Sequence, residues 1–150
     1  MSKSPPPVTP EKLHTLAEDL RVLAVKLRRR LREESHIGDF TSSQAQVLTL
    51  LEREGPATVT ALARVHGMRP QSMGETLAPL KAAGLVSGAP DPNDGRQTVL
   101  SLTPSFRKQI KASRAAREDW LYRTIQTSFT AAEQQQLATG VDLLKRLVDL

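Results

Sequence analysis

Polar side chains that can form hydrogen bonds gather at the start of one predicted helix. Gln71, Ser72, Glu75 and Thr76 fall within the first two turns after Pro70. Gln and Ser both donate and accept hydrogen bonds, and the first turns of a helix in the major groove reach the edges of DNA bases. We therefore predict DNA contacts from Arg69, Pro70, Gln71, Ser72, Met73, Glu75 and Thr76.

Residues that could support catalysis or bind a metal do not form a pattern. His14, His36 and His66 are scattered, and no acidic pair stands at a metal-ligand spacing with them. Adjacent carboxylates such as those of Glu33 and Glu34 are typical of a solvated helix surface. Phosphate-binding loops and nucleophile motifs are also missing from the sequence. We expect no enzyme, no cofactor and no metal centre, which leaves binding as the function.

Two short helical segments joined by a tight turn position the polar cluster. Thr58 is placed to cap the first, which ends at His66 and Gly67, where glycine can adopt the left-handed conformation. Pro70 begins the second, which ends before Gly84. Because Pro79 removes a helical hydrogen bond, we expect a kink between Glu75 and Pro79.

Two β-prone runs follow the second helix. Leu85–Val86 and Thr98–Leu102 are separated by a loop rich in Pro, Asp, Asn and Gly. Two helices and a hairpin make a winged helix-turn-helix, which presents its second helix to the major groove and its loop to the neighbouring backbone or minor groove. We place this DNA-binding part at residues 37–104, including a helix from Thr41 to about Glu54 that begins with a capping box.

Long amphipathic helices are predicted on both sides of the winged part, in residues 9–36 and 104–150. Their starts carry helix signals at Thr9–Pro10, Thr103–Pro104 and Thr130–Glu133. The first helix has an apolar stripe that needs a partner, either the C-terminal helices or a second chain. The stripe consists of Leu13, Leu16, Ala17, Leu20, Leu23, Ala24, Leu27 and Leu31. The predicted fold is therefore mainly α, with a small β-hairpin wing flanked by dimerisation helices.

The length fits a single domain, and the basic composition suits a polyanionic partner. The chain has 150 residues, a formal charge of +5 and no Cys, which excludes disulfides and zinc fingers. No apolar run approaches the roughly 18 residues needed to cross a bilayer, and the N-terminus lacks a secretory signal, so we expect a cytoplasmic protein. A basic cluster at Arg28, Arg29, Arg30 and Arg32 is either a solvated face or a phosphate contact.

Several motifs between Thr41 and Thr103 resemble the MarR (multiple antibiotic resistance regulator) family of winged-helix transcription factors. They are L-T-L-L-E-R-E-G-P-A-T-V-T-A-L-A, the later A-A-G-L-V, and D-P-N-D-G-R followed by L-S-L-T-P. The resemblance implies a homodimer with interleaved terminal helices that binds double-stranded DNA at a pseudo-palindromic operator. It further implies a repressor that small, often phenolic or anionic, ligands release.

The same resemblance assigns a role to the wing loop. The family's Asp-x-Arg element corresponds to Asp94, Gly95 and Arg96, with Arg96 in the minor groove, Asp94 orienting it and Gly95 permitting a tight loop. A purely structural pairing of Asp94 with Arg96 is the alternative.

The sequence departs from the family pattern at several positions, and other functions stay open. Gly74 and Glu75 replace a frequent Thr-Arg, and Glu75 would repel phosphate unless it accepts a hydrogen bond from a cytosine amino group. Gly88 replaces a frequent Arg, and Phe106 a frequent Gly. The alternatives are a helical protein-interaction module and a non-specific architectural DNA-binding protein. Trp120 and Tyr122 are candidates for lining an effector pocket between the long helices and the winged unit. For Trp120, packing in the core or in a dimer contact is the favoured alternative.

Overall fold

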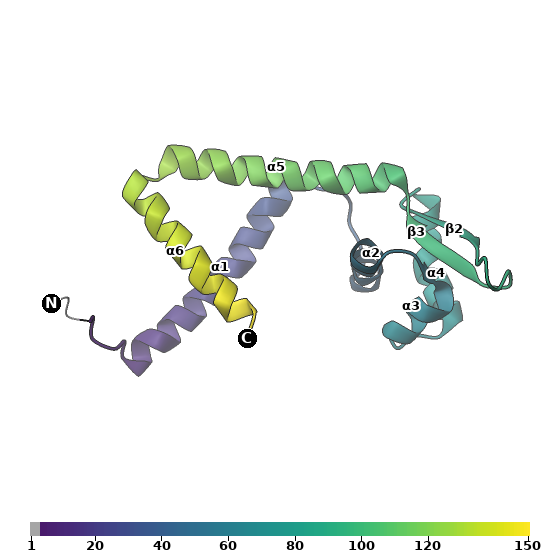
Figure 1. The fold of residues 1–150 in the computed structure, drawn as a ribbon, viewed down its shortest axis with the longest axis horizontal. Helices are drawn as coiled ribbons and strands as arrows, with labels where there is room; N and C mark the ends of the chain where they lie inside the picture. Colours follow the sequence, from purple (N-terminus) through teal and green to yellow (C-terminus); the bar gives the residue numbers. More distant parts are fainter. Residues whose placement is uncertain (1–3) are drawn as a thin grey trace. The chain divides into compact units, whose positions relative to one another are not determined.

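The computed structural model describes residues 4–150, which divide into two compact units (Figure 1). The winged unit comprises Ile37–Arg114. The helical unit comprises Met1–His36, of which residues 1–3 are not described, together with Ala115–Leu150. The predicted fold class, mainly helical with a small sheet, is confirmed.

The winged unit contains the predicted helix-turn-helix and wing. Its elements are α2 (Ser42–Glu54), β1 (Ala57–Thr58), α3 (Val59–Val65), α4 (Pro70–Ala82), β2 (Val86–Pro90), β3 (Thr98–Leu102) and the start of α5 (Pro104–Ser128). Two predicted caps are confirmed. Thr41 Oγ1 accepts a hydrogen bond from Gln44 N at 3.2 Å, while Gln44 Oε1 accepts one from Thr41 N at 3.0 Å. Thr58 Oγ1 accepts from Ala61 N at 3.1 Å and so begins α3.

The sheet has three antiparallel strands in the order β1-β3-β2. The hairpin register pairs Val86 with Leu102 and Pro90 with Thr98. Strand β1 was not predicted: its two residues pair with Leu100 and Val99 of β3. This short strand attaches the segment between α2 and α3 to the wing.

The hydrophobic core of the winged unit holds α4 in place. Met73, Leu77 and Leu80 each expose no more than 2% of their surface, and they pack in one cluster with residues of α2, α3 and the sheet. Phe106 from the first turn of α5 closes the cluster, with its ring edge-on to Phe40 at a centroid distance of 6.3 Å. The orientation of α4 is therefore fixed by its buried face.

Tight turns delimit α4 at both ends. Gly67 has φ of 61°, and Met68 N donates to Ala63 O at 2.8 Å, which closes the turn of the helix-turn-helix. At the other end Gly84 has φ of 72°, and its carbonyl accepts from Thr103 Oγ1 at 2.7 Å. Pro79 does not end the helix, which is assigned continuously from Pro70 to Ala82.

The helical unit contains α1 (Pro10–Glu34), the second half of α5 and α6 (Ala131–Val148). The guanidinium of Arg30 lies 4.6 Å from the ring centre of Trp120, and Arg117 Nη2 donates to Ser35 O at 2.9 Å. The capping box predicted at Thr130 is confirmed, since Glu133 N and its carboxylate both bond to Thr130. α1 begins at Pro10 as predicted, but the Thr9 side chain makes no capping bond.

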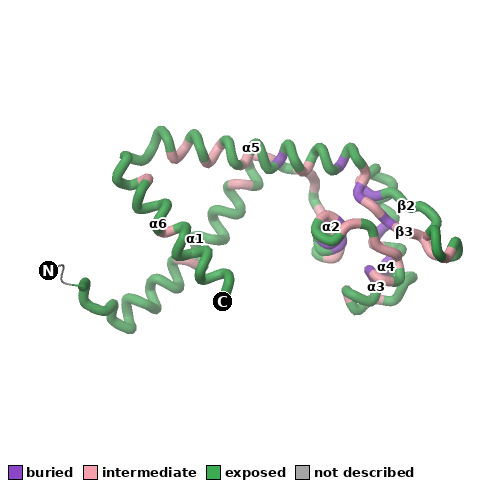
Figure 2. The backbone as a smooth tube through the Cα atoms, in the orientation of Figure 1, coloured by how far each residue is buried: buried purple, intermediate pink, exposed green. Residues whose placement is uncertain are grey.

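No residue of α1 or α6 is buried (Figure 2). On α1 the predicted stripe is open to solvent, with Leu13 at 52%, Leu16 at 53% and Leu23 at 56% exposure. α6 exposes a second apolar set, namely Leu137, Val141, Leu143, Leu144, Leu147 and Val148. Within residues 4–150, no helix is long and apolar enough to span a membrane.

Candidate nucleic-acid interface

Helix α4 presents a polar face opposite its buried face. Gln71, Ser72 and Glu75 are exposed. Each residue advances about 100° around a helix, so Glu75 lies about 200° from Met73, on the far side from the core. Thr76 is partly buried, and its hydroxyl donates to Ser72 O at 3.1 Å. Within the first two turns of α4, the exposed polar side chains are those of Gln71, Ser72 and Glu75.

The prediction that Met73 reaches DNA is wrong. Met73 exposes 0% of its surface and belongs to the core cluster. Its spacing of four residues from Leu77 and seven from Leu80 places all three on one helix face. This spacing was visible in the sequence and could have identified Met73 as a core residue.

The start of α4 combines an open helix end with a cation. Arg69 occupies the N-cap position and Pro70 the first turn, and no side chain caps the helix. Arg69 and Pro70 are both exposed. Uncapped first-turn N–H groups and the positive end of the helix dipole favour an anion such as a DNA phosphate. The exposed position of Arg69 beside this helix end suits its predicted contact with DNA.

The wing loop carries Asp94 and Arg96 in direct contact. Asp94 Oδ1 accepts a hydrogen bond from Arg96 N at 3.1 Å and lies 3.5 Å from Arg96 Nε. The Arg96 side chain is 95% exposed, whereas that of Asp94 is 44% exposed. An ion pair this exposed contributes little stability, about 0–1 kcal/mol. The structure thus brings Asp94 and Arg96 together in the loop between β2 and β3, with the arginine side chain projecting into solvent.

The expected role of Gly95 in tightening the loop is wrong. The glycines with positive φ in residues 4–150 are Gly38, Gly55, Gly67 and Gly84. A Cβ added at Gly95 would meet nothing within 4 Å. The loop is instead closed by Asp91 N donating to Gln97 O and Gln97 N donating to Asp94 O, both at 2.9 Å. Gly95 leaves open space beside Arg96.

Known proteins share this arrangement. The model of the MarR family matches residues 39–97, which cover the helix-turn-helix and most of the wing. The HTH-type transcriptional regulator MT0903.1 of Mycobacterium tuberculosis is 38% identical over 134 residues, which is 89% of this chain and 93% of that protein. The chain belongs to the MarR family.

Solved structures agree with this assignment. A Pseudomonas aeruginosa protein described as a transcriptional regulator superposes with a TM-score of 0.74 at 32% identity, covering 95% of this chain and 99% of that chain. MepR of Staphylococcus aureus, solved bound to an oligodeoxyribonucleotide, superposes with a TM-score of 0.65 at 20% identity over 88% of this chain and 97% of that chain. The second likeness concerns the fold alone. The protein is thus a MarR-family transcriptional regulator with a helix-turn-helix DNA-binding fold.

The packing around Gly88 explains why this MarR-family regulator has no side chain at that position. A Cβ added there would lie 2.8 Å from Thr98 Cγ2, on the neighbouring strand. The same point lies 3.7 Å from Lys81 Nζ, so the ammonium group of α4 occupies the space beside the missing side chain. Lys81 is an exposed cation that we did not predict from the sequence, because its proximity to Gly88 depends on the packing of α4 against β2.

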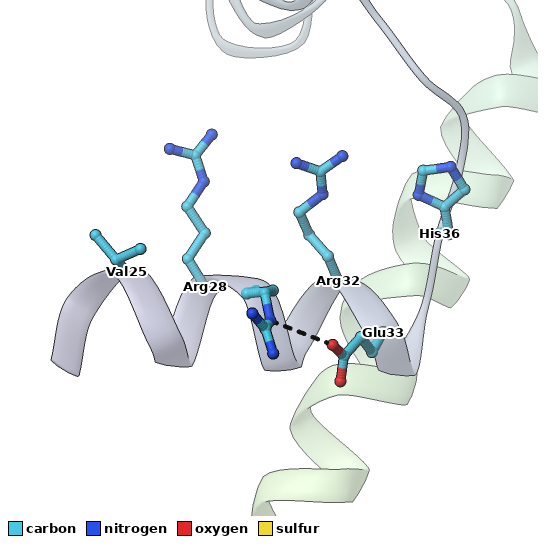
Figure 3. Close-up of a pocket in the computed structure, with 6 residues that line it drawn as sticks. Val25, Arg28, Arg32, Glu33 and His36 are labelled. Carbon is cyan, nitrogen blue, oxygen red and sulfur yellow. Dashed lines mark ion pairs between the residues drawn. The ribbon is translucent and has the colours of Figure 1, made fainter. Parts of the chain in front are cut away.

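A shallow hollow lies along the basic side of α1 (Figure 3). It is lined by Val25, Arg28, Arg29, Arg32, Glu33 and His36. Arg28 and Arg32 project to the same side of the helix, while Arg29 Nε lies 3.5 Å from Glu33 Oε1. Among the residues that the structure describes, no group of three or more His, Cys, Asp or Glu could hold a metal ion.

Proposed function

We propose that this regulator is a cytoplasmic homodimeric repressor that binds a pseudo-palindromic operator and leaves it when a small phenolic or anionic ligand binds. The observation that carries the proposal is the exposed apolar surface of α1 and α6. Leu16, Leu23 and Leu147 are each more than half exposed. A second copy of the chain, related by a two-fold axis, would cover equivalent stripes on both subunits.

Two-fold symmetry also gives the mode of DNA binding. Two copies of α4 would enter successive major grooves about one helical turn apart, and each wing would insert Arg96 into a flanking minor groove. Arg69 supports this arrangement because it is exposed at the start of α4, where it can meet a phosphate. The recognition face then reads bases through Gln71, Ser72 and Glu75.

Ligand release follows from the same geometry. A ligand changes DNA affinity only if it binds one dimer conformation better than another. Release therefore requires a conformation in which the two α4 helices no longer match the spacing of the grooves. Trp120, which is partly buried against Arg30, and Tyr122, which is 63% exposed, are the aromatic side chains of α5 that we propose to examine for ligand contact.

The first test is binding to the DNA that flanks the protein's own gene, compared with random DNA of equal length, at two salt concentrations. We expect a preference of about a thousandfold or more, with one dimer per palindrome and an affinity that falls steeply with salt. Equal, salt-sensitive affinity for both DNAs would support an architectural DNA-binding protein instead. Binding to neither DNA would support a protein-interaction module.

The wing assignment predicts the effect of one substitution. Arg96→Ala should weaken operator binding by about 1–3 kcal/mol and leave the dimer intact. Arg123→Ala removes the same charge from a side chain of α5 that pairs with Asp119, and it should leave affinity nearly unchanged. Titration by fluorescence anisotropy at fixed salt measures both. Equal affinity of wild type and Arg96→Ala would exclude a role for the wing.

A further inference from the structure

Glu75 occupies the centre of the outward face of α4. The core-facing residues Met73, Leu77 and Leu80 define one side of this helix, and Glu75 lies nearly diametrically opposite to their mean direction. Its neighbours on the outward side are Gln71 and Ser72 one turn earlier and Ala78 one turn later, all of them exposed. A helix that docks by this face brings the carboxylate towards the floor of the major groove.

The protein itself does not satisfy this carboxylate. Within residues 4–150, Glu75 takes part in no ion pair and no side-chain hydrogen bond, and it is exposed. The carboxylates of Glu33 and Asp94, by contrast, lie within 4 Å of an arginine. An unpaired negative charge on a surface that approaches DNA phosphates weakens binding to every sequence unless a base donates to it.

The hydrogen-bonding groups on the base edges determine which base can donate to the Glu75 carboxylate. Guanine presents only acceptors in the major groove, and thymine presents an acceptor and a methyl group. Adenine places its N7 acceptor beside its amino group, which repels a carboxylate, whereas the amino group of cytosine has no acceptor beside it on the same base. We propose that Glu75 is a specificity-determining residue that requires a cytosine at one position of each operator half-site. The proposal rests on the proposed function, because it assumes docking of α4 in the major groove.

Selection of duplexes from a random library by the full-length protein tests the assignment without knowledge of the operator. Wild type, Glu75→Gln, Glu75→Ala and the control Glu118→Gln are compared; Glu118 is an exposed acidic residue of α5, and the control removes the same charge. Wild type and control should select the same cytosine, and replacing it with thymine should weaken binding about tenfold or more. Glu75→Gln should shift the preference to adenine, because an amide both donates and accepts.

Glu75→Ala separates specificity from general repulsion. We expect no preference at the cytosine position and a rise in affinity for duplexes that lack the cytosine. The proposal is overturned if all four proteins select the same base and Glu75→Ala binds every duplex more tightly by the same factor, since Glu75 would then act only as a repulsive charge. If wild type selects no sequence at all, the proposed function fails and the assignment of Glu75 fails with it. Because Glu75 is exposed and unpaired, we expect the variants to unfold at the wild-type temperature.

Discussion

The two units of this chain bury their apolar residues in different ways. All thirteen buried hydrophobic residues of the described chain, from Val47 to Phe106, lie in the winged unit. The described part of the helical unit has none, although its leucines are arranged in regular stripes. The winged unit is therefore complete within one chain, and its stability depends on its own packing. The helical unit leaves its apolar stripes exposed in a single chain, so in the proposed dimer its stability should depend on protein concentration.

The largest expected effect is the loss of the dimer on placing a charge in the α1 stripe. Leu16→Asp removes an apolar side chain that each subunit of a symmetric dimer would bury, at about 1.5–3 kcal/mol for each copy. The two copies together lose at least about 3 kcal/mol, so the change should raise the dimer dissociation constant by about a hundredfold or more, and sedimentation velocity measures it. Val25→Asp is the matched control, because Val25 follows Leu16 by about two and a half turns and so lies on the opposite, basic side of the same helix. A dimeric Leu16→Asp protein would contradict the proposed interface.

A core substitution should affect the winged unit alone. Phe106 is 1% exposed and contacts Phe40 edge-on, so Phe106→Ala should lower the free energy of unfolding by about 3–5 kcal/mol. Phe129→Ala should lower it less, because Phe129 is 39% exposed. Urea unfolding followed by circular dichroism gives both values, and light scattering should still detect a dimer at concentrations where the protein is folded. Equal losses of unfolding free energy for Phe106→Ala and Phe129→Ala would contradict the described difference in burial between the two units.

Removal of a helix cap should have the smallest effect on stability. The two N-cap threonines of α1 and α3 provide a matched pair of variants. Thr58→Ala removes the hydrogen bond to Ala61 N and should destabilise the winged unit by about 1 kcal/mol. Thr9 occupies the equivalent position before α1 but makes no side-chain bond. Thr9→Ala should therefore change stability by less than about 0.5 kcal/mol. Thermal unfolding compares them, and a larger effect for Thr9→Ala would reverse the expected order.

Local signals in the sequence predicted most of the fold. Caps at Thr41, Thr58 and Thr130 depend on side chains within three residues, so they can be recognised without knowledge of tertiary packing. Strand β1 was missed because it has two residues and pairs with Leu100 and Val99, which are more than forty residues away in the sequence.

The candidate site was predicted less completely than the fold. The polar positions of α4 were identified by residue type, and this approach also assigned Met73 to DNA without testing which helix face it occupies. Lys81 could not be identified, because its position beside Gly88 depends on how α4 packs against β2. The pairing of Asp94 with Arg96 was anticipated from a motif, and the structure adds the hydrogen bond to Arg96 N that orders the loop.

Helix α4 is held in the fold by one face and is free on the other, which has an evolutionary consequence. Met73, Leu77 and Leu80 supply its buried contacts, while Gln71 and Glu75 project away from the core. If Gln71 and Glu75 read bases as proposed, substitutions at these two outward positions should change recognition with little effect on folding. On the proposed mode of binding, a descendant of this regulator would acquire a new operator after gene duplication by a few substitutions, without first acquiring compensating changes in its core.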